Sequence, residues 1–319
     1  MQVFRNFSEL PINLKGSVYA IGNFDGLHIG HNFVIEAARD MSVKKNVPLG
    51  VLTFDPHPRE FFRPNEPSFR LTPRMVKLSI LEKWGVDFVM NVAFNKSLSE
   101  TDALTFIKKH LLEELNVSGI VVGHDFAFGK NRQGNISMLK DVSKNKSTEL
   151  LVVNPQLSDS GSLYSSRSIR EFLQSGRPEE AAKLLGRWWS ISGVVIKGAR
   201  RGRELGYPTA NIRLDDYIQP SLGIYAVWAK IEGNESWHEA AASLGVRPTF
   251  DGGEVLLEVY LLNYNRDLYN KRLDVAFIKY LRPEEKFIDV QSLKKQMEID
   301  CKKSKELLSK INFSVEYFS

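Results

Sequence analysis

The chain has 319 residues, 43% of them hydrophobic, so it is long enough for two domains with buried cores. Its net charge of +5 suits an enzyme that acts on phosphates but leaves nucleic-acid binding open. It shows no membrane-length apolar stretch and no signal peptide, and its single cysteine, Cys301, excludes internal disulfides, so we expect a cytoplasmic protein.

The first half of the chain alternates between strand-like and helix-like segments. Short apolar runs of the buried-strand type occur at residues 17–24, 48–54, 87–94, 119–123 and 149–154. One helix is expected from Thr72-Pro73, and another from Ser99, where Asp102 would complete a capping box. The alternation predicts a doubly wound parallel sheet, which binds ligands at the carboxyl ends of its strands.

The second half becomes β-rich after two short expected helices at residues 168–174 and 178–186. Between residues 188 and 282 apolar runs are separated by turns without a long helix, which predicts an antiparallel β-barrel. Helical spacing returns over residues 290–308. We place the boundary between the two domains after residue 184, which gives domains over residues 1–184 and 185–319.

A motif rich in glycine and histidine, GNFDGLHIGH, follows the first predicted strand at residues 22–31. Gly26 and Gly30 allow a tight turn into a helix, whose N-terminal amides attract phosphate. His28 and His31 lie three residues apart and share one helix face, where both can donate to phosphate oxygens. Two solvated or capping histidines at a turn would give the same pattern.

Two further loops follow strands at the edge where ligands are expected. Residues 53–58 surround His57 after the second strand, and Asp125, Phe126 and Phe128 follow the fourth strand. The alternatives are a rigid proline-rich turn around His57 and core packing of the two phenylalanines.

A loop rich in glycine and arginine, residues 198–207, runs into Pro208, Thr209, Ala210 and Asn211 in the second half. Thr209 and Asn211 offer neutral oxygen ligands, which suit Mg²⁺ held jointly with substrate phosphates. Glu258 shares a predicted strand face with apolar neighbours, where a carboxylate is costly unless it has a task. The alternatives are solvated or nucleic-acid-facing arginines and an edge-strand glutamate in solvent.

In this order, the motifs resemble the bifunctional bacterial flavokinase/FAD synthetase family, and the resemblance covers nearly the whole chain. Residues 202–211 resemble the ATP- and metal-binding signature of riboflavin kinases, and residues 22–31 resemble the HxGH nucleotidyltransferases. The resemblance implies an N-terminal α/β nucleotidyltransferase domain and a six-stranded riboflavin kinase barrel with a C-terminal helix. It also implies two reactions that need Mg²⁺: ATP phosphorylates riboflavin to FMN, and a second ATP adenylylates FMN to FAD, releasing pyrophosphate.

The resemblance assigns roles to individual residues. It implies that His28 and His31 are catalytic in the N-terminal site and that Glu258 is the base of the kinase, with Thr209 and Asn211 on the metal. The implied ATP and phosphate contacts of the N-terminal site are Gly22, Asn23, Phe24, Asp25, Gly30, Asp125, Ser165, Ser166 and Arg170. The implied ATP contacts of the kinase are Gly198, Gly202, Arg203, Gly206 and Pro208. The implied flavin contacts are His57, Phe126, Phe128 and Arg282.

Three positions depart from the pattern of the family. Arg167 replaces the usual Thr or Ser, so one alternative is a riboflavin kinase with an impaired N-terminal site. Ser243 replaces Asn and Asn270 replaces Gly, but neither is a proposed base or metal ligand. A nucleic-acid-binding protein that uses the arginine-rich loop is the other rival. We expect riboflavin, FMN, FAD and ATP as partners, and neither nucleic acid nor membrane.

Overall fold

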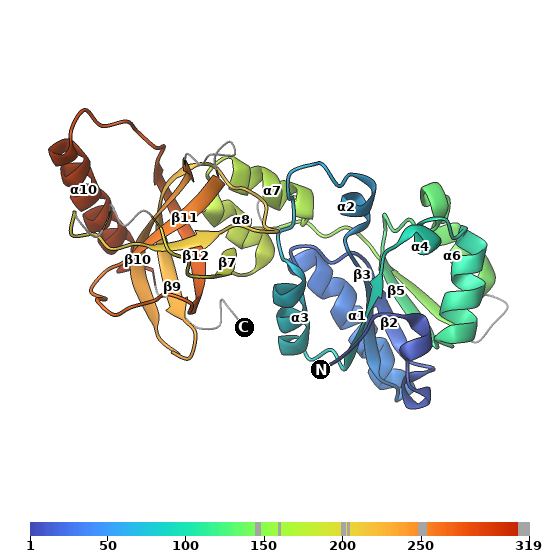
Figure 1. The fold of residues 1–319 in the computed structure, drawn as a ribbon. Coiled ribbons are helices and arrows are strands. Elements are labelled where there is room, and N and C mark those ends of the chain that lie inside the picture. Colours follow the sequence, from blue (N-terminus) through green and yellow to red (C-terminus); the bar gives the residue numbers. More distant parts are fainter. Residues whose placement is uncertain (144–147, 159–160, 199–201, 203–204, 248–253, 312–319) are drawn as a thin grey trace. The chain divides into compact units, whose positions relative to one another are not determined.

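The computed structural model describes residues 1–143, 148–158, 161–198, 202, 205–247 and 254–311 (Figure 1). The chain forms two compact units, the first made of Met1–Pro67 and Thr72–Tyr164, the second of Ser68–Leu71 and Ser165–Ser319. The helices between residues 166 and 185 therefore group with the second unit, whereas the boundary after residue 184 stays a prediction. No helix in the described ranges is both long and apolar enough to cross a membrane.

A sheet of six parallel strands forms the centre of the first unit, in the order β1-β4-β3-β2-β5-β6. Its strands are β1 (Gln2–Phe4), β2 (Val18–Ile21), β3 (Leu49–Asp55), β4 (Phe88–Ala93), β5 (Gly119–Gly123) and β6 (Glu149–Val153). Its helical segments are η1 (Phe7–Glu9), η2 (Ile12–Leu14), α1 (Ile29–Lys45), α2 (Pro58–Phe62), α3 (Arg74–Lys83), α4 (Lys96–Ser99), α5 (Ala103–Thr105), η3 (Phe106–Glu114), η4 (Lys130–Arg132) and α6 (Ile136–Ser143).

The inner strands β2 to β5 are buried on both faces, because their alternate residues enter different cores. Tyr19 and Ile21 of β2 pack in a core with side chains of η1, η3 and α6. Val18 and Ala20 of the same strand pack with side chains of α1 and α3 on the other face (Figure 1). This two-sided burial is the reason why the strands are recognisable as apolar runs in the sequence.

The order of the strands reverses direction at β2. The chain proceeds from β2 to β3 and β4 on one side and continues with β5 and β6 on the other. In doubly wound sheets the ligand crevice lies at such a reversal, at the carboxyl ends of the strands. Here the loops that begin at Gly22 and Gly123 follow β2 and β5.

A six-stranded antiparallel sheet forms the second unit, in the order β7-β12-β9-β10-β11-β8. A bridge between Ile196 and Asn211 connects the chain after β7 with β8, so the sheet approaches closure into a barrel. Its elements are α7 (Ser166–Gln174), α8 (Pro178–Leu185), β7 (Ser190–Val194), β8 (Ala210–Arg213), β9 (Gly223–Ile231), β10 (Trp237–Arg247), β11 (Glu254–Leu261), β12 (Arg272–Arg282) and α10 (Val290–Leu308).

The predicted architecture of both halves is confirmed, but some local predictions are wrong. Ser99 does not start a helix: it ends α4, and Asp102 caps α5 by accepting the N–H of Thr105. Pro73 is the N-cap of α3, not its first residue. The short edge strand β1 was not predicted at all.

Candidate active sites

The loop after β2 is held in a tight turn by buried apolar anchors. Phe24 and Leu27 have φ angles of 49° and 43°, and their side chains are 2% and 0% exposed. Asp25 is also buried; its Oδ1 accepts the backbone N–H of Thr72 at 3.1 Å, and the Gly26 N–H donates to the Thr72 hydroxyl at 2.9 Å. Asp25 thus orders the loop, and its predicted phosphate contact stays a prediction.

The two histidines of the motif meet at the N-terminus of α1. His28 caps the helix, because its Nδ1 accepts the backbone N–H of His31 at 3.3 Å. A neutral His28 therefore carries its proton on Nε2. The two rings stack with centroids 3.7 Å apart. A Cβ on Gly30 would lie 3.0 Å from both the His28 ring and Tyr164, a tight contact that the absence of a side chain avoids.

A buried lysine connects the ends of β2 and β3. The Lys77 ammonium, on α3, donates to the carbonyl of Asn23 at 2.7 Å and to the Thr53 hydroxyl at 3.4 Å. The Thr53 hydroxyl also donates to the Asn23 carbonyl, at 3.1 Å. Gly22 packs against the Phe24 ring beside them. No local pattern pointed to Lys77, because its partners Asn23 and Thr53 are 54 and 24 positions away along the chain.

His57 caps the short helix α2 by accepting the N–H of Arg59 at 3.1 Å. Next to it, Phe61, Phe62 and Phe94 pack edge to face, with centroids 5.3–5.8 Å apart. The Phe62 side chain is 62% exposed. The motif around His57 pointed only to the histidine and did not indicate this aromatic group.

The loop after β5 divides into an exposed and a buried part. Asp125 is exposed and Phe126 is half-buried. Phe128 is 7% exposed and packs in the core, stacked on Phe126 at 5.3 Å and next to Phe106 at 5.5 Å. The alternative of core packing therefore holds for Phe128, whereas Phe126 remains a candidate flavin contact.

In the second unit, Ser165 is the N-cap of α7. Its hydroxyl accepts the N–H of Ser168 at 3.1 Å and lies 2.9 Å from the Ser168 hydroxyl. Ser166 is the first helical residue, so it contributes to an N-terminus whose amides can bind an anion.

Arg170 and Arg167 of α7 have different surroundings: Arg170 contacts Phe69, whereas Arg167 is exposed. Arg170 donates from Nε to the Phe69 carbonyl at 2.9 Å, and its guanidinium lies 5.0 Å from the centre of the Phe69 ring. Arg167 is 87% exposed and pairs with Glu171 at 2.9 Å. The unusual arginine thus points into solvent and does not contact Ser165.

Strand register brings the candidate base and a candidate metal ligand together. Glu258 of β11 is directly opposite Asn211 of β8 and, on its other side, opposite Ser243 of β10. Side chains at such opposed positions are neighbours on one face of a sheet. β11 lies between β8 and β10, so the alternative of an edge-strand glutamate is wrong.

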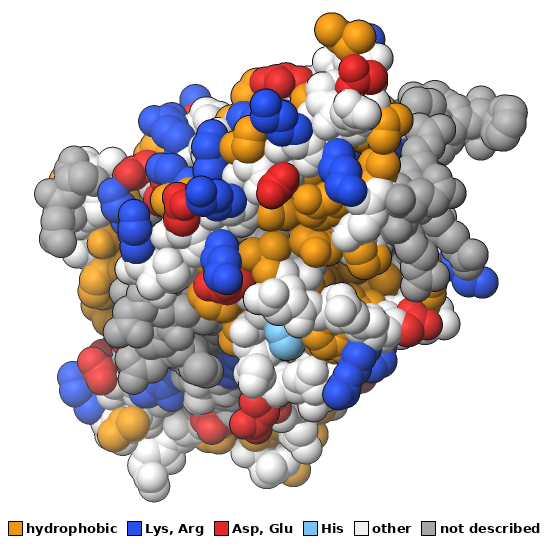
Figure 2. Space-filling view, turned by 90° about the vertical axis from the view of Figure 1, so that its left-hand side faces the viewer, with side chains coloured by type: hydrophobic (Ala, Val, Ile, Leu, Met, Phe, Trp, Pro, Cys, Tyr) orange, Lys and Arg blue, Asp and Glu red, His pale blue; other side chains and the backbone are white. Residues whose placement is uncertain are grey.

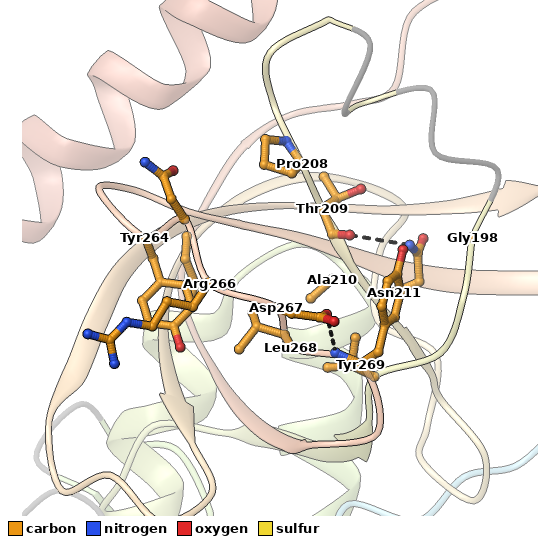
Figure 3. A pocket seen from close by; sticks show the side chains of 13 residues that line it. Gly198, Pro208, Thr209, Ala210, Asn211, Tyr264, Arg266, Asp267, Leu268 and Tyr269 are labelled. Atoms are coloured by element: carbon orange, nitrogen blue, oxygen red, sulfur yellow. Dashed lines mark hydrogen bonds between the residues drawn. The ribbon is translucent and has the colours of Figure 1, made fainter.

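A cavity of about 260 Å³ opens next to Thr209 and Asn211 (Figure 3). Asn211 is 7% exposed, and its Nδ2 lies 3.5 Å from the Thr209 carbonyl. The predicted residues Gly198 and Pro208 line the cavity too. The opposite wall is the segment from Tyr264 to Tyr269, to which the sequence analysis assigned no role; there Asp267 accepts the N–H of Tyr269 at 3.0 Å.

Two glycines of the predicted ATP loop lie where no side chain fits. A Cβ on Gly198 would overlap the Asn211 side chain, and one on Gly202 would overlap the Tyr207 carbonyl. Gly206 has a φ of 87°, which favours glycine. Arg203, the remaining predicted ATP contact, lies outside the described residues, as do Arg200 and Arg201.

Arg247 contacts the candidate base, Glu258, and two further side chains. The sequence did not indicate any of these contacts. Its Nε pairs with Oε1 of Glu258 at 2.6 Å, and one terminal nitrogen pairs with Glu284 at 3.2 Å. The other terminal nitrogen donates to the Ser243 hydroxyl at 3.4 Å. Glu258 is 26% exposed and Arg247 33%.

Arg282 forms an ion pair with Asp300 of α10. Its Nε and a terminal nitrogen donate to both carboxylate oxygens of Asp300 at 2.7–3.1 Å, with the two side chains 14% and 5% exposed. Burial alone would lower the pKa of Arg282, but hydrogen bonding to Asp300 and its charge raise it. Its predicted flavin contact stays a prediction.

Apolar and aromatic groups lie near these charges. Tyr207 and Tyr260 contact each other edge to face at 5.2 Å, and burial raises the pKa of both phenols. Val246, Ile288, Val290 and Ile299 are exposed. Figure 2 shows one face of the molecule on which apolar side chains gather in a hollow bordered by Lys and Arg.

Comparison with known families assigns both halves of the chain. The sequence model of FAD synthetase matches residues 10–167, and that of riboflavin kinase matches residues 185–308. A bifunctional riboflavin kinase/FMN adenylyltransferase from Buchnera aphidicola is 35% identical over 94% of this chain and 96% of its own length. One from Haemophilus influenzae is 36% identical over 96% and 98%.

The fold also matches a solved structure over its whole length. A crystal structure described as a macrolide-efflux protein from Streptococcus pneumoniae has a TM-score of 0.84 and 29% identity, covering 98% of this chain and 99% of its own. The similarity supports the two-part architecture, and the description applies to that protein.

Proposed function

The chain belongs to the family of bifunctional riboflavin kinase/FMN adenylyltransferases, and we propose a role for its own residues in each of the two reactions. As a transferase, it phosphorylates riboflavin with ATP and adenylylates FMN with ATP. The alternative of a kinase with an impaired N-terminal half is not favoured. The exposed, solvent-directed Arg167 supports this conclusion.

The observation that carries the kinase assignment is the opposed position of Glu258 and Asn211. The attacking group of riboflavin is a neutral hydroxyl, so its reaction gains from a base that accepts the proton. Glu258 is a half-buried carboxylate beside the cavity residue Asn211. We assign Glu258 as the base, and Thr209 and Asn211 as residues that orient the phosphates of ATP.

The donor set at this position fits Mg²⁺. Thr209 and Asn211 present hydroxyl and amide oxygens, and the described residues contain no cluster of three or more His, Cys, Asp or Glu that would hold a metal alone. Mg²⁺ is usually bound by few protein oxygens together with substrate phosphates, whose developing charge it neutralises. Thr209 and Asn211 would hold the ion on the protein side.

The N-terminal reaction makes different demands. The phosphate of FMN is already an anion, so it attacks the α-phosphorus of ATP without a base, and pyrophosphate leaves. The task of the protein is to position the phosphates and neutralise their charge. The stacked pair His28 and His31 at the start of α1 supports this role, as does its place beside the reversal of strand order. The exposed Phe62 group suits stacking against a flat ring system such as the flavin.

Chromatography of flavins after incubation with ATP and Mg²⁺ tests both assignments. We expect the unchanged protein to convert riboflavin to FMN and then to FAD. Glu258→Gln should stop FMN formation while FAD still forms from added FMN, and the double change His28→Ala and His31→Ala should do the reverse. Kinase activity that survives in Glu258→Gln would overturn the assignment of the base.

A cytoplasmic location, proposed from the single cysteine, is a separate expectation.

A further inference from the structure

Arg247 at the end of β10 contacts two carboxylates that come from different parts of the second unit. Glu258 belongs to β11, and Glu284 belongs to the segment between β12 and α10. Both are held through their Oε1 atoms, at 2.6 Å and 3.2 Å, by different nitrogens of the same guanidinium. The Ser243 hydroxyl lies within 3.4 Å of both Arg247 and Glu284, which closes the group.

The strand geometry directs these groups to one face. Ser243, Gly245 and Arg247 alternate along β10, so all three are on the face that holds Glu258. A Cβ on Gly245 would overlap the Glu284 carboxylate, so this carboxylate lies directly against the backbone of β10. The absence of a side chain at Gly245 therefore lets the Glu284 carboxylate reach Arg247.

We propose that Arg247 is a positioning residue of the kinase reaction: it fixes the Glu258 carboxylate for proton transfer and ties it to Glu284 in the segment after β12. This inference rests on the proposed role of Glu258 as the base. In that reaction the riboflavin oxygen bonds to the γ-phosphorus of ATP, its proton passes to Glu258, and the bond between the γ-phosphorus and ADP breaks. Arg247 contacts only the base and not the reacting atoms.

An arginine suits this task better than a lysine. Its planar guanidinium has five donors in a fixed geometry, so it can hold Glu258, Glu284 and Ser243 at once. A lysine ammonium on a flexible side chain would not fix the positions of these three groups to the same degree. Its contact uses one acceptor site of the Glu258 carboxylate and leaves others for the substrate hydroxyl. Burial alone would lower the pKa of Arg247, but its hydrogen bonds to Glu258 and Glu284 and the charges of these carboxylates raise it. The Arg247 guanidinium therefore remains charged.

The experiment compares full-length variants by steady-state riboflavin kinase assays, with FMN adenylylation in the same preparation as a reference. For Arg247→Met we expect the kinase kcat to fall by about 10- to 100-fold, as for a misplaced catalytic group, with the KM values for riboflavin and ATP changed less than about threefold. Arg247→Lys should recover part of the loss, and Glu284→Gln should cause a smaller one. Arg213→Met is the matched control, because Arg213 of β8 pairs through Nε with Glu254, which is on β11 four residues before Glu258.

A double change separates positioning from a structural role. If Arg247 acts through Glu258, then adding Arg247→Met to Glu258→Gln should lower the residual rate no further. Equal losses in Arg247→Met and Arg213→Met, or a further full loss in the double variant, would overturn the inference. If Arg247→Met does not fold, Arg247→Lys and Glu284→Gln provide the same comparison. Failure of the proposed function is distinct, since Glu258→Gln alone would then keep its kinase activity.

Discussion

At the residue scale, Gly198 and Asn211 form a contact that a single methyl group would break. The position of a Cβ on Gly198 is 2.7 Å from Cγ of Asn211, and the Asn211 amide is buried. Gly198→Ala should therefore displace the amide and lower the kinase kcat/KM by about 100-fold, the loss expected for a displacement of about 1 Å. Flavin chromatography measures this, with FMN-to-FAD conversion by the same variant as the control. Unchanged kinase activity would show that Asn211 does not need this position.

The thiol of Cys301 gives a prediction about pH. Burial, with a smaller contribution from the Asp300 charge, raises its pKa from 9.0 to about 11. Only the thiolate reacts with alkylating agents, so a rise of this size leaves about 100-fold less reactive form at pH 8. The rate of alkylation by iodoacetamide should still be rising between pH 9 and pH 10 in the folded protein. In urea it should level off near the pH of an ordinary thiol; equal profiles in the two conditions would contradict the burial.

The residues around Glu258 show what a sequence predicts and what it leaves open. Alternation along one strand singled out Glu258, and a local motif singled out Asn211. Their opposed position depends on register, which is set by pairing across the sheet and not by either segment alone. No local pattern links Arg247 to its two carboxylate partners, because they are 11 and 37 positions away.

At the scale of elements, the ion pair between Arg282 and Asp300 connects α10 to the end of β12. Removing one partner of a buried pair leaves the other charge uncompensated and typically costs about 3–5 kcal/mol. Asp300→Ala should therefore lower the free energy of unfolding of the second unit by that amount, measured by urea denaturation followed through kinase activity. Glu306→Ala on an exposed position of the same helix should change it by no more than about 0.5 kcal/mol. Equal effects of the two changes would refute a stabilising role for the pair.

The elements themselves were predictable to different degrees. The strands β2 to β5 are buried on both faces and are recognisable as continuous apolar runs. The more exposed β6 also has an apolar run, whereas the three-residue β1 is too short to give a pattern. Asn270, which stands where the family carries glycine, has the left-handed φ of 63° that a glycine often supplies. The capping box at Ser99 failed because Asn95 and Asp102 cap two separate short helices, α4 and α5. A local motif cannot distinguish one helix start from the end of another.

At the scale of the whole molecule, the second unit includes a short segment from early in the chain. Ser68–Leu71 groups with residues 165–319, and Phe69 and Leu71 are 7% and 0% exposed. The indole of Trp189 donates to the Leu71 carbonyl at 2.9 Å, and the backbone of Arg70 accepts the N–H of Ile218 at 2.8 Å. The second unit is therefore not continuous in sequence.

This discontinuity predicts how a fragment should behave. A fragment of residues 165–319 lacks the segment, so the buried Trp189 donor loses its partner, at a cost of about 1–3 kcal/mol, and the apolar contacts of Phe69 and Leu71 are lost as well. The fragment should lose kinase activity at a lower urea concentration than the intact chain does. Phe69→Ala in the intact chain should shift the midpoint in the same direction, because it removes part of the same packing while the chain remains whole. If the fragment and the intact chain lost activity at the same urea concentration, the segment would be dispensable and the unit would be complete from Ser165 onward.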